Sequence, residues 1–179
     1  MTDIAINTLS AIGFVDLPQA ESLNPALSAA YYREHNRAEV RRSHHFGGRY
    51  ENIYVSADRL PELAPVREFA LSAAAQMLGR ESLHHGFWFN EMQPGQRTTL
   101  HTHEEHDELL SAVYYLSCTA NSGRLILHDD DALISVTPRP GLLVLFPPDL
   151  PHEVEENASD QVRLSIAFNF GPARRPTGS

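Results

Sequence analysis

Apolar residues follow helical spacing in the first part of the chain, after a short opening strand, and strand-like spacing further on. Residues 61–79 have apolar side chains three and four positions apart, which is typical of an amphipathic helix, and Gly79 is a natural helix stop. Residues 24–43 are rich in helix formers, with Asn24 suited to cap a helix and Pro25 suited to its first turn. We therefore expect a helix in each of these segments.

From Leu83 onward the spacing changes to short strand-like runs, separated by Pro, Gly, Asn and Asp, which favour turns. The runs read HHGFWFNEMQPG, LLSAVYYLSC, GRLILHDD, DALISVTPRPG, GLLVLFPP, HEVEEN and QVRLSIAFNFG. Helices followed by many short strands predict a mainly β protein of the α+β class, a β-sandwich or jelly roll with helices packed on one side. We expect a single domain over residues 1–179, with mostly helical support in 1–82, a jelly-roll core in 83–170 and a flexible tail in 171–179.

The composition is that of an ordinary globular protein, with 42% hydrophobic and 21% charged residues among 179. The formal net charge of −9 argues against nucleic acid or an anionic membrane as the main partner, although a local basic pocket can still bind a small anion. Cys118 is the one cysteine, so an internal disulfide is impossible and a reducing compartment is the simplest setting. The start MTDIAINTLSAIGFV lacks signal-peptide features and no stretch has the length of a membrane span, so we expect a cytoplasmic protein.

Three histidines form a candidate metal site. His101 and His103 lie two residues apart on a strand-like segment, so in extended backbone both side chains point to the same face. Two neutral imidazoles on one face can hold a metal ion, and His152 is the leading candidate for the third ligand. The prolines of FPPDLPHEV favour a strand that ends at Phe146, followed by a loop that delivers His152. Taken alone, a histidine-rich run is also compatible with a polar loop that binds no metal.

Arg163 is a candidate anion-binding residue. Strand alternation in QVRLSIAFNF places Arg163 and Ser165 on one face and their apolar neighbours on the other. Burying an arginine inside a small β-fold costs free energy unless an anion compensates its charge. The planar guanidinium suits a carboxylate, to which it can donate two parallel hydrogen bonds. Ser165 can donate a further hydrogen bond to the same group. The alternative is an exposed arginine that pairs with Asp160 or Glu155.

Several of these segments together resemble a known family. HTH, SAVYYL, GRLILHDD, PGLLVLFPPDLPHEVEEN and RLSIAFNF look like the iron(II)- and 2-oxoglutarate-dependent oxygenases, most closely short bacterial members, over roughly Phe87 to Phe170. The resemblance implies a double-stranded β-helix, a cupin-like jelly-roll barrel with iron in its open mouth. It also implies Fe(II) as cofactor, 2-oxoglutarate as cosubstrate, and hydroxylation of an unidentified small molecule or side chain.

The resemblance further implies the metal ligands, position by position. His101 matches the first and His152 the distal ligand, while His103 stands where the family usually has a carboxylate. No catalytic residue is implied beyond these ligands. A neutral histidine at the second position leaves the site one unit more positive and can favour other metals. A second register uses His103 with Glu105 and restores a carboxylate, but it leaves His101 unused.

The resemblance also implies how the cosubstrate is held. Arg163 matches the residue that pairs with the far carboxylate of 2-oxoglutarate, Ser165 its helper, and Tyr115 a position that often supports the same molecule. Specificity is then expected from segment 35–52, HNRAEVRRSHHFGGRYEN, whose Arg and His residues suit an anionic substrate, a lid or simply a solvated helix face. The expected partners are a small-molecule substrate and dioxygen, without nucleic acid or membrane. A homodimer through the N-terminal helices is a further hypothesis.

Two other interpretations stay open. GQRTTLHTHEEHDE also fits the first motif of a cupin, in which Glu108 joins His101, His103 and His152 at a metal that works without a 2-oxo acid, as in a dioxygenase or isomerase. An inward-facing Arg163 has no use in a cupin and separates this interpretation from the oxygenase. The remaining interpretation is a non-catalytic jelly-roll binding protein whose metal is incidental or absent.

Overall fold

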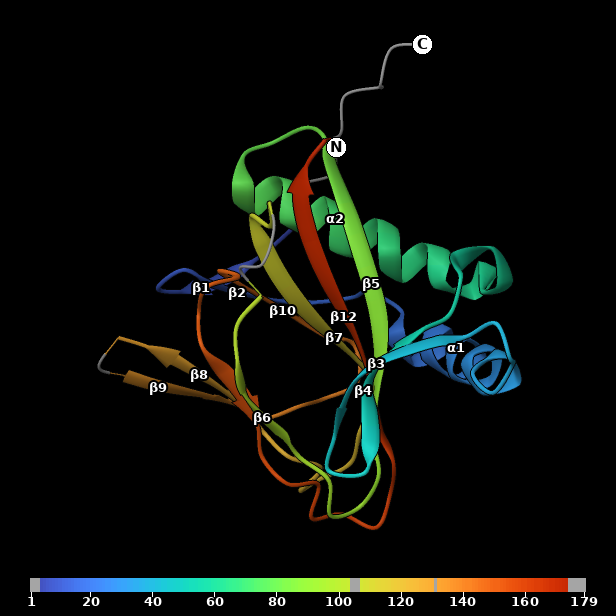
Figure 1. Cartoon of the computed structure of the whole chain (residues 1–179). Helices are drawn as coiled ribbons and strands as arrows, with labels where there is room; N and C mark the ends of the chain where they lie inside the picture. The colour runs from blue at the N-terminus through green and yellow to red at the C-terminus, as the bar shows by residue number, and fades with distance from the viewer. Residues whose placement is uncertain (1–3, 104–106, 131, 174–179) are drawn as a thin grey trace.

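Two β-sheets face each other in the computed structural model of the protein, which describes residues 4–103, 107–130 and 132–173 (Figure 1). The strands are β1 (Asn7–Leu9), β2 (Ile12–Asp16), β3 (Arg41–Phe46), β4 (Arg49–Tyr54), β5 (Leu83–Met92), β6 (Thr98–His101), β7 (Leu110–Ser117), β8 (Leu125–Asp129), β9 (Ala132–Val136), β10 (Leu142–Phe146), β11 (His152–Val154) and β12 (Arg163–Pro172). The larger sheet has the order β1-β2-β10-β7-β12-β5-β4-β3, and the smaller sheet has the order β6-β11-β8-β9.

From β5 onward the chain passes back and forth between the sheets. Strands β5, β7, β10 and β12 belong to the larger sheet, and the intervening β6, β8, β9 and β11 belong to the smaller one. The pairings between neighbouring strands are antiparallel. This alternation is the topology of a jelly roll, so the predicted mainly β architecture is confirmed.

Helices cover the outer face of the larger sheet. α1 (Ala20–Glu34) and α2 (Ala64–Leu78) pack there together with the short 3₁₀ turns Ala57–Arg59 and Pro61–Leu63. Alternation along β12 sends Leu164 and Ile166 into this helical layer, where each buried side chain contributes about 1.5–3 kcal/mol. The intervening side chains of β12 point the opposite way, into the space between the sheets. Within the described part of the chain, no helix combines the length and apolar character needed to cross a membrane.

The helix expected over 61–79 is confirmed, since α2 ends at Leu78 and Gly79 adopts the left-handed conformation that closes a helix (φ 61°). The start expected for the other helix is wrong. α1 begins at Ala20, so Pro25 lies inside it and Asn24 does not cap it. The Asn24 side chain instead donates to the Leu116 carbonyl (3.0 Å) and accepts from the Tyr114 hydroxyl (2.6 Å). The side-chain amide of Asn24, expected from the local sequence to cap the helix, therefore binds two residues of the sheet instead.

The second half of segment 24–43 is also different from the prediction, because the helix stops at Glu34 and β3 begins at Arg41. β3 and β4 form a hairpin that extends the larger sheet. Its turn is Gly47-Gly48, both with positive φ (55° and 79°), which glycine adopts without a steric penalty. The N-terminal part of the chain thus supplies four strands as well as helices, so 1–82 is less helical than expected.

The ends of the later strands lie close to where the sequence placed them. β10 ends at Phe146 and β11 starts at His152, as the prolines between them predict. At the C-terminal end, β12 continues through Pro172, so the first residues of the expected flexible tail belong to a strand. Residues 174–179 lie outside the described part of the chain.

Candidate active site

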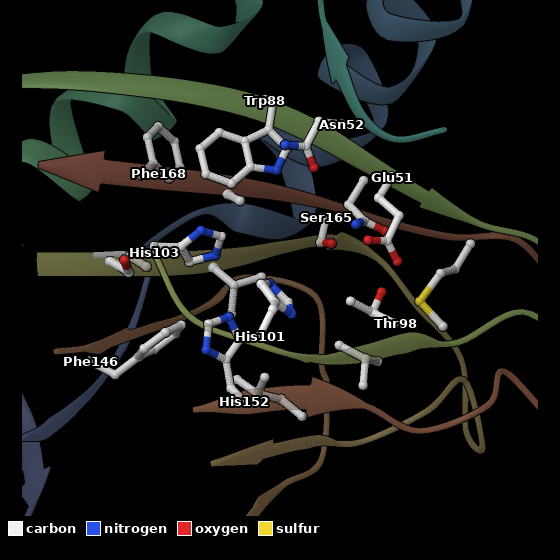
Figure 2. Close-up of a pocket in the computed structure, with 18 of the residues that line it drawn as sticks. Glu51, Asn52, Trp88, Thr98, His101, His103, Phe146, His152, Ser165 and Phe168 are labelled. Carbon is white, nitrogen blue, oxygen red and sulfur yellow. The ribbon is translucent and has the colours of Figure 1, made fainter. Parts of the chain in front are cut away.

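Three histidines meet between the two sheets (Figure 2). His101 is the last residue of β6 and His152 the first residue of β11, and the two lie directly opposite each other in the antiparallel register. His103 follows β6 by two residues and is fixed by its backbone N–H, which donates to the Pro148 carbonyl (2.7 Å). The candidate ligand atoms of the three side chains all lie within 4.8 Å of one another. The structure therefore brings together the three histidines that the sequence singled out.

Hydrogen bonds orient two of these imidazoles toward the shared centre. The Nδ1 atom of His101 lies 2.7 Å from the Thr99 carbonyl, and Nδ1 of His152 lies 2.9 Å from the Leu150 carbonyl. A carbonyl oxygen only accepts, so each Nδ1 carries the proton and each Nε2 keeps a free lone pair. Metal-binding histidines are commonly oriented in this way by a backbone carbonyl.

The electrostatic environment keeps the imidazoles of His103 and His152 neutral. Burial, followed by the neighbouring His152 and His101, lowers the pKa of His103 to about 3. Burial, followed by His101, lowers the pKa of His152 to about 4. Neutral imidazole is the form that binds a metal, so the site is ready for a cation at neutral pH. A set of three nitrogen donors around one point fits a divalent first-row metal such as Fe(II).

Of the two carboxylates proposed as further ligands, Glu108 belongs to the described part of the chain and does not join this cluster. Glu105, the partner in the alternative register, lies outside the described residues. Glu108, the fourth ligand of a cupin site, is described and lines the groove outside the cavity. The cluster of potential ligands among the described residues consists of the three histidines alone.

Arg163 lies in the same cavity as the histidines and is only 2% exposed. Its Nη1 donates to the Gly123 carbonyl (3.2 Å) and lies 3.8 Å from Sδ of Met92, whereas its buried Nε has no hydrogen-bond partner among the described residues. The alternative of a surface ion pair is wrong, because Glu155 binds Arg124 instead (2.8 Å). A buried guanidinium with an unused donor and no carboxylate in reach among the described residues is suited to an acidic ligand.

Ser165 and Tyr115 lie close to this guanidinium. Ser165 is buried and lines the cavity two residues along β12 from Arg163, as strand alternation predicts. The Tyr115 ring centroid lies 5.0 Å from the guanidinium carbon, and burial raises the pKa of Tyr115 to about 12. The buried Tyr115 hydroxyl has no partner among the described residues, so it offers a second unused donor next to the first. These orphaned groups fit a bound carboxylate.

Several residues of the cavity wall were not named individually from the sequence, although two of them belong to segment 35–52. Trp88 and Asn90 face inward from β5, and Glu51 and Asn52 face inward from β4 (Figure 2). Trp88 packs edge-to-face on His103, with 5.5 Å between the ring centroids. Two signals were available: the alternation of FWFNEM along β5, and the Gly-Gly pair that marks a hairpin turn before β4.

The cavity opens into a wider groove on the outside. The inner cavity has a volume of about 70 Å³ and the outer groove about 660 Å³. Glu51, Asn52, Trp88, His101 and His103 line both spaces and form the boundary between them. The β3–β4 hairpin supplies much of the groove wall, so the segment expected to determine specificity does lie beside the candidate metal site.

Comparisons with known proteins agree with this geometry. The family model of the 2OG-Fe(II) oxygenase superfamily matches residues 87–171, which include all three histidines, Tyr115, Arg163 and Ser165. A comparison with curated proteins finds no match.

Solved structures with the same fold cover most of the chain. A prolyl-4-hydroxylase from Pseudomonas putida aligns with a TM-score of 0.63 at 20% identity, over 92% of this chain and 89% of its own. A prolyl hydroxylase from Trichoplax adhaerens, in complex with a hypoxia-inducible factor peptide, aligns with a TM-score of 0.73 at 14% identity, over 90% and 84%. EvdO2 from Micromonospora carbonacea var. aurantiaca, complexed with 2-oxoglutarate, aligns with a TM-score of 0.62 at 16% identity, over 99% and 96%.

The structural matches show that the jelly roll is the double-stranded β-helix of these oxygenases. The sequence match covers the strands that carry the histidines and the buried arginine. Residues 87–171, just under half of the chain, therefore match the 2OG-Fe(II) oxygenase superfamily, and the fold that contains them is that of the oxygenases above.

Proposed function

We propose that the protein is an Fe(II)- and 2-oxoglutarate-dependent dioxygenase that holds its metal on His101, His103 and His152 and hydroxylates a small molecule or a side chain. The observation that carries the proposal is the presence of Arg163 in the same cavity as the three clustered imidazoles. Candidate cation ligands and a carboxylate-binding group thus line one cavity, and a 2-oxo acid that binds a metal needs both. Bound Fe(II) supplies the activation of dioxygen, coupled to the conversion of 2-oxoglutarate into succinate and carbon dioxide.

The chain's own contribution is to position the reactants and to exclude water. The guanidinium of Arg163 binds the far carboxylate of 2-oxoglutarate, and the hydroxyl groups of Ser165 and Tyr115 supply further hydrogen-bond donors. Apolar side chains of the small sheet and of β10, such as Leu125, line the same space and keep it dry. The substrate enters through the outer groove and meets the metal at the boundary between groove and cavity.

His103 in place of a carboxylate makes the site different from the usual ligand set of the family. The three protein ligands are all neutral, so the full double charge of the metal is left for the cosubstrate to balance. A dianionic 2-oxo acid is well matched to such a site. A cytoplasmic location and a homodimer stay predictions from the sequence, and the substrate is predicted only as a small molecule or a side chain.

The proposal is tested by metal and cosubstrate binding together with turnover. Purified protein is titrated anaerobically with Fe(II) and 2-oxoglutarate by calorimetry, and succinate is then measured in air. We expect His152→Ala to lose metal binding, and Arg163→Ala to keep metal but lose 2-oxoglutarate. His128→Gln and Arg124→Ala are matched controls, because both change the same residue types outside the cavity.

The results also separate the proposal from its rivals. Metal binding without any 2-oxoglutarate binding would favour the cupin interpretation. Absence of metal binding, with unchanged stability in chelator, would favour the non-catalytic one.

A further inference from the structure

Arg49 is a second, nearly buried arginine close to the cavity. It is the first residue of β4, directly after the Gly47-Gly48 turn, and its side chain is only 8% exposed. An arginine at a hairpin end normally extends into water, so its burial requires partners.

Three of the partners of Arg49 are residues of the cavity wall. Its Nη2 donates to Thr98 Oγ1 (3.0 Å) and lies 3.3 Å from Glu51 Oε1, and its Nη1 lies 3.4 Å from Asn90 Oδ1. Thr98, Glu51 and Asn90 all line the inner cavity. Arg49 thus lies behind the wall and contacts both sheets, because Thr98 belongs to β6 and the others to β4 and β5.

Glu51 and Arg163 bring a negative and a positive side chain to the wall of the inner cavity. Glu51 is the one carboxylate among the described residues that line the inner cavity, and it does so together with Arg163. A carboxylate in the wall of a cavity that receives a dianion repels it, unless a cation neutralises that carboxylate. Arg49 is the cation in place, and it forms the ion pair with Glu51 that the structure records. Burial lowers the pKa of Arg49 from its ordinary value, the ion pair with Glu51 opposes this, and the positive charge of the nearby Arg163 lowers it further.

We propose that Arg49 is a positioning residue for the cosubstrate: it neutralises and holds Glu51, and thereby lets the cavity accept a dianionic 2-oxo acid beside Arg163. The inference rests on the proposed function and adds to it a charge pair carried by the β3–β4 hairpin. Because Glu51 also lines the outer groove, the pair lies where cosubstrate and substrate meet. Arg49 acts through Glu51, and its effect is therefore removed when the Glu51 charge is removed.

The test is a double-mutant cycle on 2-oxoglutarate affinity, measured by calorimetry with Zn(II) in place of Fe(II) so that no turnover occurs. Arg49→Gln should weaken binding about tenfold, because an unpaired carboxylate then faces the ligand. Glu51→Gln alone should tighten binding several-fold. The double variant Arg49→Gln with Glu51→Gln should bind within about threefold of the wild type. For 2-oxopentanoate, which lacks the far carboxylate, Arg49→Gln should have a much smaller effect.

The cycle distinguishes this role from a purely structural one. If Arg49 only ties the sheets together, the double variant stays as weak as Arg49→Gln and both acids are affected equally, which overturns the proposal. Unchanged affinity in Arg49→Gln also overturns it. If Arg49→Gln does not fold, Glu51→Gln alone decides, since unchanged or weaker binding contradicts the proposal. Failure of the wild type itself to bind 2-oxoglutarate, with Zn(II) bound, would instead refute the proposed function.

Discussion

Replacing Arg163 with methionine should stabilise the protein without ligand and abolish its response to 2-oxoglutarate. The guanidinium is 2% exposed and lacks a carboxylate partner among the described residues, so the folded state carries a charge removed from water with incomplete compensation. A methionine of similar length fills the same space next to Met92 without that charge.

The magnitude follows from the contacts. Removing a guanidinium from water costs several kcal/mol. The charge-assisted hydrogen bond to the Gly123 carbonyl returns about 1.5–3 kcal/mol, and the Tyr115 ring returns about 2 kcal/mol at most. We expect the Met variant to gain about 1–3 kcal/mol in the free energy of unfolding, which raises Tm by about 3–9 °C in a chain of this size.

The assay is thermal unfolding with Zn(II), with and without 2-oxoglutarate. Wild-type protein should gain about 2.7 kcal/mol at a 2-oxoglutarate concentration 100-fold above Kd, and the Met variant should gain nothing. Arg124→Met is the matched control, because this arginine is 53% exposed in its side chain and pairs on the surface. A Met variant that unfolds at lower temperature and still responds to 2-oxoglutarate would refute the reasoning.

Three further predictions concern stability and reactivity. Asn24→Ala should lower the free energy of unfolding by about 2–4 kcal/mol in urea denaturation, because it leaves the buried Tyr114 hydroxyl without its acceptor; a loss below 1 kcal/mol would contradict this. Gly141→Ala should lower the free energy of unfolding by about 2–4 kcal/mol in the same measurement, because Gly141 has φ +90° and a Cβ there would lie 2.6 Å from the Cβ of Ala20. Gly47→Ala is the control: Gly47 has open space around it, and the loss should be about 1 kcal/mol. Burial raises the pKa of the Cys118 thiol to about 11, so its alkylation by iodoacetamide at pH 8 should be about 100-fold slower in the folded than in the urea-unfolded protein; equal rates would show that the thiol is not shielded.

The inward direction of Arg163 could be predicted from the sequence because strand alternation has a period of two. Apolar Leu164 and Ile166 determine which face of β12 meets the helices, and the arginine and serine between them must then point the other way. The interruption between the strand that ends at Phe146 and the strand that begins at His152 could also be predicted, because the Pro residues between them prevent a continuous central strand. Both inferences depend on local rules that the rest of the fold does not override.

The β3–β4 hairpin could not be predicted from hydrophobic spacing, because β3 is an edge strand whose residues are mostly exposed. Without a buried face, its sequence RRSHHF has no apolar alternation, and the helix formers before it suggest that the helix continues. Only the Gly47-Gly48 pair marked the turn. As a result the sequence linked segment 35–52 to specificity as a whole, without assigning a role to Arg49 or Glu51 individually.

The charges of the site explain why histidine is acceptable where a carboxylate is usual. A carboxylate ligand stabilises a buried cation before any cosubstrate arrives, whereas three neutral imidazoles leave the double charge uncompensated in a poorly solvated cavity. The nearby Glu51 is engaged by Arg49 and is not among the clustered ligands, so it does not take over that role. In the proposed function, a dianionic 2-oxo acid would balance the charge of the metal with one carboxylate and that of Arg163 with the other. Metal and cosubstrate should therefore strengthen each other's binding, and by linkage they do so by the same factor.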